Sequence, residues 1–293
     1  FRLLGNLVKF AASGGGGMEL RQAYEDVRKT FGDLATNEAN SVIESFQEMR
    51  SRAGDLGGTG LSLSRVFGVG PAGLAAALRA VNELAESLGA RFSVLQDDIA
   101  RAGGEIIAFQ KGLGLTSEQM AALGTRAISE GRTFDDVLSE TASLAIQMGD
   151  QFGVSAKLIS KDMATMAADF ENFGSLSQEE LATTAVFARK LGLEVQDLQG
   201  VIGAFDNFES AAENASKLAQ AFGVNIDAIQ MLNAENPAER IDQLRDSFFA
   251  AGKSIENMTR QERALLAQTT GLSGAALEAA FAQENMGLSY DQI

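Results

Sequence analysis

The longest regular pattern of hydrophobic positions in the chain spans residues 74–110. Alternating steps of four and three residues connect its apolar positions through five heptads, and charged residues lie between them. A period of 3.5 residues keeps one apolar stripe facing a partner when helices supercoil around each other. We therefore predict a coiled-coil helix that joins copies of the chain. Its interface positions are Leu74, Leu78, Val81, Leu88, Phe92, Leu95, Ile99, Ile106 and Phe109, with Ala85 and Ala102 between them.

The same pattern also fits an amphipathic helix that folds against its own chain. Gly89 and the pair Gly103–Gly104 weaken an isolated helix, because each glycine costs about 1 kcal/mol relative to alanine. A helix that contains them has to be held by partners, which favours several copies side by side. Leucine, valine, alanine and phenylalanine are mixed along the seam, so the pattern itself does not fix the number of strands.

Two segments precede this helix. Residues 1–53 combine an apolar stretch with a long predicted helix, Met18 to Arg52, whose apolar positions also follow steps of four and three. Residues 54–73 contain seven glycines among apolar residues. We interpret this loop as buried between helices, as a fold-back where chains meet, or as a segment that engages a membrane.

Residues 111–293 change from long seams to short helices with marked ends. A recurring element places a glycine between two apolar residues, followed after four residues by another apolar residue. Glycine takes the left-handed conformation that ends a helix, and the next apolar residue closes over the last turn. The pattern predicts repeated helical hairpins. Its glycines are Gly114, Gly153, Gly192, Gly223 and Gly271.

Helix starts are equally well marked. Capping boxes, in which a hydroxyl and a carboxylate or amide satisfy the first backbone N–H groups, begin at Thr116, Ser177 and Thr259. Asn236 precedes a proline that suits the first helical position. No period-2 run of β-branched residues is present. We predict an all-α chain with long coiled-coil helices followed by a bundle of short helical hairpins, in a multi-chain assembly.

The composition removes most catalytic and metal chemistry. The 293 residues include no histidine and no cysteine, so Ser-His-Asp and Cys-His machinery and zincin-type sites are excluded. Adjacent carboxylates such as Asp97 and Asp98 point about 100° apart on a helix and do not share a site. Ala251–Ser254 resembles the end of a phosphate-binding loop, but Ser247 stands where that motif needs its first glycine. We expect no enzyme activity, no cofactor and no metal.

The charge distribution limits the kinds of partner that the chain can bind. The net charge is −15, and the whole excess lies in residues 66–293. Such a surface has no basic stripe to neutralise phosphates, so we expect no direct binding of nucleic acid. The longest uncharged apolar stretch, Val66 to Leu78, is shorter than the ~18 residues of a membrane span.

Two similar segments, Asp169–Phe173 and Ala204–Phe208, lie 35 residues apart. In each, two phenylalanines flank acidic and amide residues. We predict that these rings anchor helix ends inside the core.

Three short motifs occur in the hairpin region: DNFE at 206–209, ERID at 239–242 and ERALLAQ at 262–268. They lie within LSQEELATTAVFARKLGLEVQDLQGVIGAFDNFESAAENASKLAQAFGVNIDAIQMLNAENPAERIDQLRDSF and MTRQERALLAQTTGL. With these motifs, its alanine-rich helices and its glycine-apolar stops, the region resembles the tail tape measure proteins of tailed bacteriophages. The resemblance covers a little over half of the chain.

The resemblance implies a helical structural virion protein in several copies, commonly three, inside the tail tube near the tail tip. Such a protein is made in the host cytoplasm, fixes the length of the tail tube, docks on the hub or baseplate and leaves ahead of the DNA. An alternative is a membrane-active helical protein that contacts the host membrane and aids genome passage. A third possibility is a muralytic enzyme that uses a lone glutamate.

Overall fold

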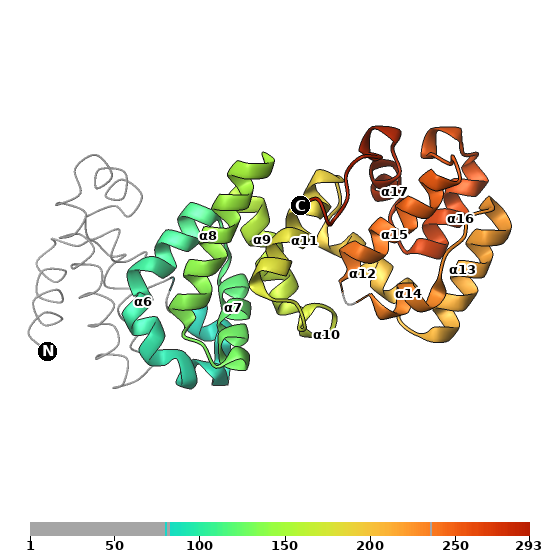
Figure 1. The fold of residues 1–293 in the computed structure, drawn as a ribbon. Coiled ribbons are helices and arrows are strands. Elements are labelled where there is room, and N and C mark those ends of the chain that lie inside the picture. Colours follow the sequence, from blue (N-terminus) through green and yellow to red (C-terminus); the bar gives the residue numbers. More distant parts are fainter. Residues whose placement is uncertain (1–79, 81–82, 235) are drawn as a thin grey trace, which may run out of the picture. The chain divides into compact units, whose positions relative to one another are not determined.

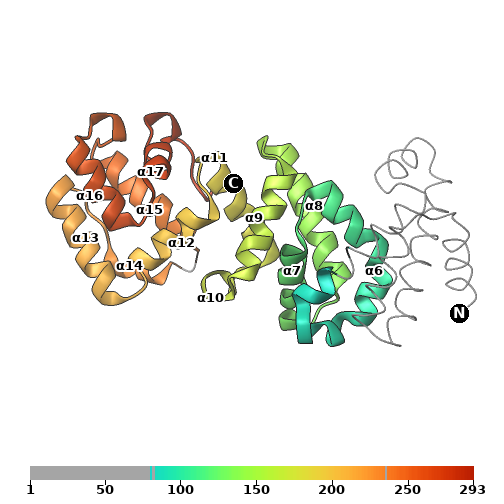
Figure 2. The same cartoon turned by 180° about the vertical axis from the view of Figure 1, so that it is seen from behind.

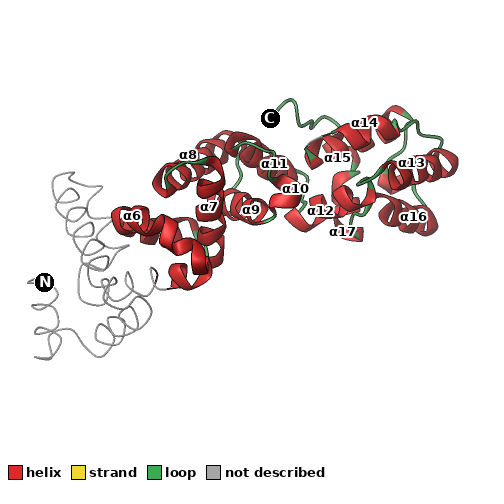
Figure 3. Cartoon of the chain, turned by 90° about the horizontal axis from the view of Figure 1, so that it is seen from below, coloured by secondary structure: helices red, strands yellow, loops and turns green. Residues whose placement is uncertain are grey.

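The structure, a computed structural model, describes residue 80, residues 83–234 and residues 236–293 (Figure 1). Over these residues it contains twelve bounded α-helices, three short 3-10 helices and no strand. Figure 3, coloured by secondary structure, shows helices joined by short loops throughout this part of the chain. The predicted all-α class is confirmed for these residues. The predicted segments 1–53 and 54–73 lie outside them.

The chain divides into two compact units, residues 1–143 and 144–293. The division falls inside a helix, α8 (Phe134–Phe152). We describe each unit by itself.

In the first unit, residues 83–88 are helical and lead into a 3-10 turn, η1 (Gly89–Arg91). Two helices follow, α6 (Phe92–Leu113) and α7 (Ser117–Glu130), and they pack against each other before α8 begins. Buried residues from the helical stretch 83–88 and from α6, α7 and α8 form the apolar interior of this unit. They include Leu84, Leu88, Leu95, Ile99, Ile106, Met120, Leu123, Phe134 and Val137.

The expected single helix over residues 74–110 is interrupted. Gly89 has a φ of +55°, which ends the helical run of residues 83–88 and starts a new direction for α6. Leu88-Gly89-Ala90, followed after four residues by Leu95, is a further copy of the glycine element that ends helices in the hairpin region. The regular heptads hid this copy, because the apolar positions continue across it without a gap.

The second unit consists of short helices joined by tight turns. They are α9 (Ala156–Ala168), α10 (Phe170–Phe173), α11 (Gln178–Lys190), α12 (Val195–Ala204), α13 (Phe208–Phe222), α14 (Ala228–Asn233), α15 (Pro237–Ala250), η2 (Ile255–Asn257), α16 (Arg260–Thr270), α17 (Gly274–Ala280) and η3 (Gln283–Asn285). Neighbouring pairs such as α9 with α11, α13 with α14, and α16 with α17 pack side by side, as the opposite views of Figure 1 and Figure 2 show.

One core runs through this second unit. Its largest members are phenylalanines, and several of the rings contact one another. The ring centroids of Phe222 and Phe248 are 5.1 Å apart, and those of Phe248 and Phe281 are 5.2 Å apart. Such tilted and edge-on pairs stabilise a core beyond the area that they bury.

The predicted helix ends are confirmed. All five glycines of the stop element have positive φ angles, between 69° and 75°. Thr116, Ser177 and Thr259 each form a complete capping box, and Asn236 caps α15 ahead of Pro237. Gly252 also has a φ of 68°, two residues after α15 ends, which confirms that Ala251–Ser254 is a helix end and not a phosphate loop.

Candidate functional site

The sequence pattern predicts nine interface residues on one seam, and the structure describes six of them. Leu74, Leu78 and Val81 lie outside the described residues. Phe92 and Phe109 are half-buried. The remaining four are at most 3% exposed: Leu88, Leu95, Ile99 and Ile106.

The glycine at position 124 shows what covers part of this seam. A Cβ atom added to Gly124 would lie 2.9 Å from Leu95 Cδ1 and 3.4 Å from Leu88 Cδ2. Both leucines therefore pack against α7 of the same chain. For these residues the alternative interpretation, a helix that folds against its own chain, describes the structure. Association of copies through this seam stays a prediction, and with these leucines covered it requires residues outside the described part or an opening of the unit.

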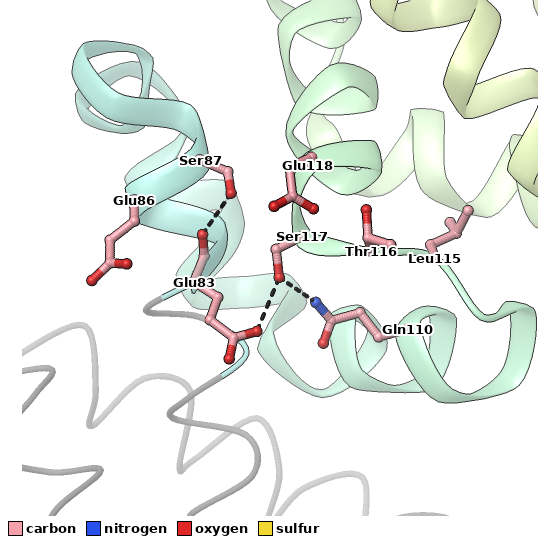
Figure 4. A pocket seen from close by; sticks show the side chains of 8 residues that line it. All are labelled: Glu83, Glu86, Ser87, Gln110, Leu115, Thr116, Ser117 and Glu118. Atoms are coloured by element: carbon pink, nitrogen blue, oxygen red, sulfur yellow. Dashed lines mark hydrogen bonds between the residues drawn. The ribbon is translucent and has the colours of Figure 1, made fainter.

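A polar cavity of about 720 Å³ lies beside the start of α7 (Figure 4). Ser117 Oγ donates a hydrogen bond to Glu83 Oε2 at 3.2 Å and accepts one from Gln110 Nε2 at 3.2 Å. The lining residues are Glu83, Glu86, Ser87, Gln110, Leu115, Thr116, Ser117 and Glu118.

The ionisable side chains of this cavity are the exposed carboxylates of Glu83, Glu86 and Glu118. Hydrogen bonds from backbone N–H and from the Thr116 hydroxyl lower the pKa of Glu118, which keeps it ionised. No lining residue is a cation, and the described residues contain no group of three His, Cys, Asp or Glu side chains arranged to hold a metal ion.

The two phenylalanine segments differ from the prediction in half of their rings. Phe173 and Phe205 are fully buried, as expected. Phe170 and Phe208 are 60% and 64% exposed, so the prediction that they anchor the core is wrong. Each is the first residue of its helix, α10 or α13, where the first turn points the side chain away from the packed face.

A buried ion pair joins α9 to α11. Arg189 Nε and Nη2 donate to the two carboxylate oxygens of Asp162 at 2.5 and 2.7 Å. This bidentate contact raises the pKa of Arg189 and fixes the register of the two helices. Nearby, Gln199 of α12 donates to Asp169 at 2.7 Å and links α12 to the loop before α10.

The most extensive polar site centres on Arg245 of α15, which is 1% exposed. Its guanidinium donates at 2.9 Å to the Ala280 carbonyl, and at 2.8 Å each to the Leu288 carbonyl and to Asp242. It also donates to the Asn285 carbonyl. Two rings lie beside it, with the Arg245 Cζ 6.0 Å from the centroid of Phe187 and 5.6 Å from that of Phe249.

Three further residues complete this site. The second carboxylate oxygen of Asp242 accepts the Tyr290 backbone N–H at 2.7 Å. Asn236 Nδ2 donates to the Tyr290 hydroxyl at 2.7 Å and to Thr184 Oγ1 at 2.8 Å. The Tyr290 ring meets Phe187 edge-on, with centroids 5.7 Å apart. Arg245 thus donates four hydrogen bonds, in keeping with the need of a buried charge for polar partners.

Burial changes the proton affinities of this pair in opposite senses. Loss of solvent lowers the pKa of Arg245, and the neighbouring carboxylates oppose that change. Loss of solvent raises the pKa of Asp242, and the Tyr290 N–H and Arg245 oppose it. The sequence pattern does not reveal this site, because most of its contacts join residues that lie 35 to 54 positions apart. The part of the site that is local in sequence is the pair Asp242 and Arg245, three residues apart on one helix.

The described residues contain no candidate membrane-spanning helix that would support the membrane-active alternative. None of the described helices is both long and apolar enough to cross a bilayer. The stretch Val66–Leu78, on which this alternative depends, lies outside the described residues and stays a prediction.

The residues that the structure describes form an all-α fold of short helices. Comparison of the chain with protein-family models, with curated proteins and with solved structures gives no match.

Proposed function

We propose that the chain is a structural segment of a bacteriophage tail tape measure protein. The observation that carries this proposal is the fit between the resembling residues and the helices. Residues 176–248 and 258–272 cover α11 to α14, α16 and nearly all of α15, and the glycine stops Gly192, Gly223 and Gly271 follow α11, α13 and α16. In this role the protein fixes the length of the tail tube, docks at the tail tip hub and leaves ahead of the DNA.

The hairpin region suits the docking part of such a protein better than the measuring part. A continuous helix extends about 1.5 Å per residue, whereas a chain that folds back on itself gains much less length. We therefore assign residues 144–293 to a compact body at the tail tip. Measuring belongs to extended helical residues elsewhere in the protein.

The acidic surface supports this role. A net charge of −15 disfavours binding to the phosphate backbone, so a protein that precedes DNA through a tube is not held by it. The Asp162–Arg189 and Asp242–Arg245 pairs are internal, which leaves the acidic excess on the outer surface.

The proposal is tested by locating the chain in particles. A short epitope tag is inserted at Gly131, an exposed turn between α7 and α8, in the phage that encodes the chain. Antibody-gold labelling of opened tails should mark the lumen close to the tail tip, and the label should disappear from particles after DNA ejection. Purified particles that contain the tagged chain nowhere in the tail would overturn the proposal.

The copy number is tested separately. We propose a homo-oligomer, commonly a trimer in proteins of this kind. Native mass measurement of the purified chain at micromolar concentration should show the oligomer. A monomer under these conditions would count against association through residues 74–109. It would also agree with the burial of Leu88 and Leu95 against α7 of the same chain.

A further inference from the structure

The last twelve residues, 282–293, pack differently from the helices around them. We call this segment the C-terminal strap. None of its residues is buried, whereas Phe281, immediately before it, is fully buried. Leu288, Tyr290 and Ile293 lie only partly covered against the core. A segment with so little buried apolar surface is among the first parts of a domain to open locally.

Polar contacts hold the strap, and most of them reach its main chain. Arg245 donates to the carbonyls of Asn285 and Leu288, and Asp242 accepts the N–H of Tyr290. The principal side-chain contact is made by Tyr290, through its hydroxyl with Asn236 and its ring with Phe187. This division matches peptide recognition, in which main-chain hydrogen bonds supply affinity and a side-chain pocket supplies specificity.

The surface below the strap cannot remain empty without cost. We define the strap groove by Thr184 and Phe187 of α11 and by Asn236, Asp242 and Arg245 around α15. Release of the strap removes carbonyl acceptors from a guanidinium that is otherwise enclosed by two rings, and it uncovers Phe187. A buried donor that loses its acceptor is costly, so the groove favours an occupant with the same groups.

We propose that the strap groove is a binding site for a peptide segment that adopts the turns of the strap, and that the strap of a second copy of this chain binds there when the chain's own strap is released. A second copy supplies every contact that the resident strap makes, with no new surface needed. Exchange of an identical element between copies is a low-cost route to association. It uses residues 184–293 and is independent of the seam at residues 74–109.

The first test uses a fluorescent peptide with the sequence of residues 282–293. It is added to the full chain carrying Tyr290→Ala, which weakens the resident strap and leaves the groove residues unchanged. We expect saturable binding. The same peptide with Tyr290→Ala should bind roughly tenfold or more weakly, because it loses the hydroxyl and ring contacts. A peptide with Met286→Ala is the matched control, since Met286 is 49% exposed, and it should bind like the unchanged peptide.

Changes in the added peptide cannot unfold the protein. The peptide comparison therefore decides the outcome even if a substitution at Arg245 unfolds the chain. Where the full chain with Tyr290→Ala and Arg245→Met retains its helical circular dichroism, it should lose binding of the unchanged peptide. Equal binding of all three peptides, or no binding at millimolar concentration, would overturn the peptide site.

The second test addresses the second copy. Because the chain has no cysteine, single cysteines label it at chosen positions. One preparation carries a donor dye at Glu179→Cys on α11, and the other carries an acceptor at Met286→Cys in the strap. Energy transfer should appear after mixing and should be suppressed by excess unlabelled peptide. Absence of transfer at any chain concentration would show that a second copy is not the occupant. Neither test involves a phage tail, so its failure and failure of the tail location are independent results.

Discussion

The two units bury their apolar helix faces by different means. In the first unit, Leu88 and Leu95 from the seam and Phe134 from α8 converge on Gly124. In the second unit, short helices without a long seam enclose contacting phenylalanine rings, and two helices meet backbone to backbone at Gly200 and Gly271. Regular and irregular apolar faces thus both end up covered within one chain. A hydrophobic period shows which face is buried, but not whether the cover comes from the same chain or from another copy.

The aromatic core of the second unit gives the largest expected effect. Phe173→Ala should lower the free energy of unfolding by about 3–5 kcal/mol, because it empties a fully buried ring site. Phe170→Ala, three residues earlier in the same short helix, should change it by less than about 0.5 kcal/mol. Urea unfolding followed by circular dichroism measures both. Similar losses for the two variants would show that Phe170 packs in solution.

The backbone contact in the second unit comes next. A Cβ at position 200 would lie 2.1 Å from the carbonyl oxygen of Gly271, and backbone cannot move aside as a side chain can. Gly200→Ala should therefore cost about 3 kcal/mol. Gly203→Ala on the same helix meets nothing within 4 Å and should stabilise by up to about 1 kcal/mol. Thermal unfolding of the pair checks both signs, and a stabilising Gly200→Ala would refute the close contact.

The first unit should respond more mildly to the same kind of change. Gly124→Ala brings a Cβ within 2.9 Å of Leu95 Cδ1, the end of a flexible side chain, so we expect a loss of about 1–2 kcal/mol. Gly112→Ala, in open space near the end of α6, is the control and should not destabilise. If Gly124→Ala had no effect on unfolding, the seam would not be packed on α7 in solution.

The smallest expected effect is a pH dependence of stability that differs between two capping boxes. The box at Thr116 is closed by Gln119, which does not titrate, whereas the box at Thr259 is closed by Glu262. Hydrogen bonds from the Thr259 N–H and hydroxyl lower the pKa of Glu262 below its usual 4.5. Its contribution is therefore present above about pH 4.5 and is lost as the pH falls through the lowered value. Glu262→Gln should be less stable than the parent chain at pH 7, and the two should converge in acid. A difference that did not change with pH would contradict the lowered pKa.

The local features of this fold were predictable, and the long-range ones were not. Glycine stops and capping boxes depend on residues within five positions, so Gly114, Thr116 and Gly271 could be assigned from sequence. The break at Gly89 had the same local pattern, but the continuous heptads outweighed it. The exposure of Phe170 and Phe208 depends on which face of a short helix meets its neighbours, and no residue nearby in sequence encodes that.

The site around Arg245 was beyond sequence reasoning for the same reason. Arg245 contacts carbonyl groups at positions 280, 285 and 288, which any residue type presents. Only the approach of the strap to α15 in space brings them together. Asp242 and Arg245 lie three residues apart on one helix, a spacing that is also typical of surface ion pairs.

The main-chain character of the strap contacts has a consequence for how this chain can change over evolutionary time. Substitutions at positions such as Gln283, Met286 or Gln292 leave the carbonyl and N–H groups that meet α15 in place, so these positions can diversify. Arg245, Asp242 and Tyr290 have no such latitude. In natural variants of this protein, we expect Asp242, Arg245 and Tyr290 to be conserved while the other residues of the strap vary.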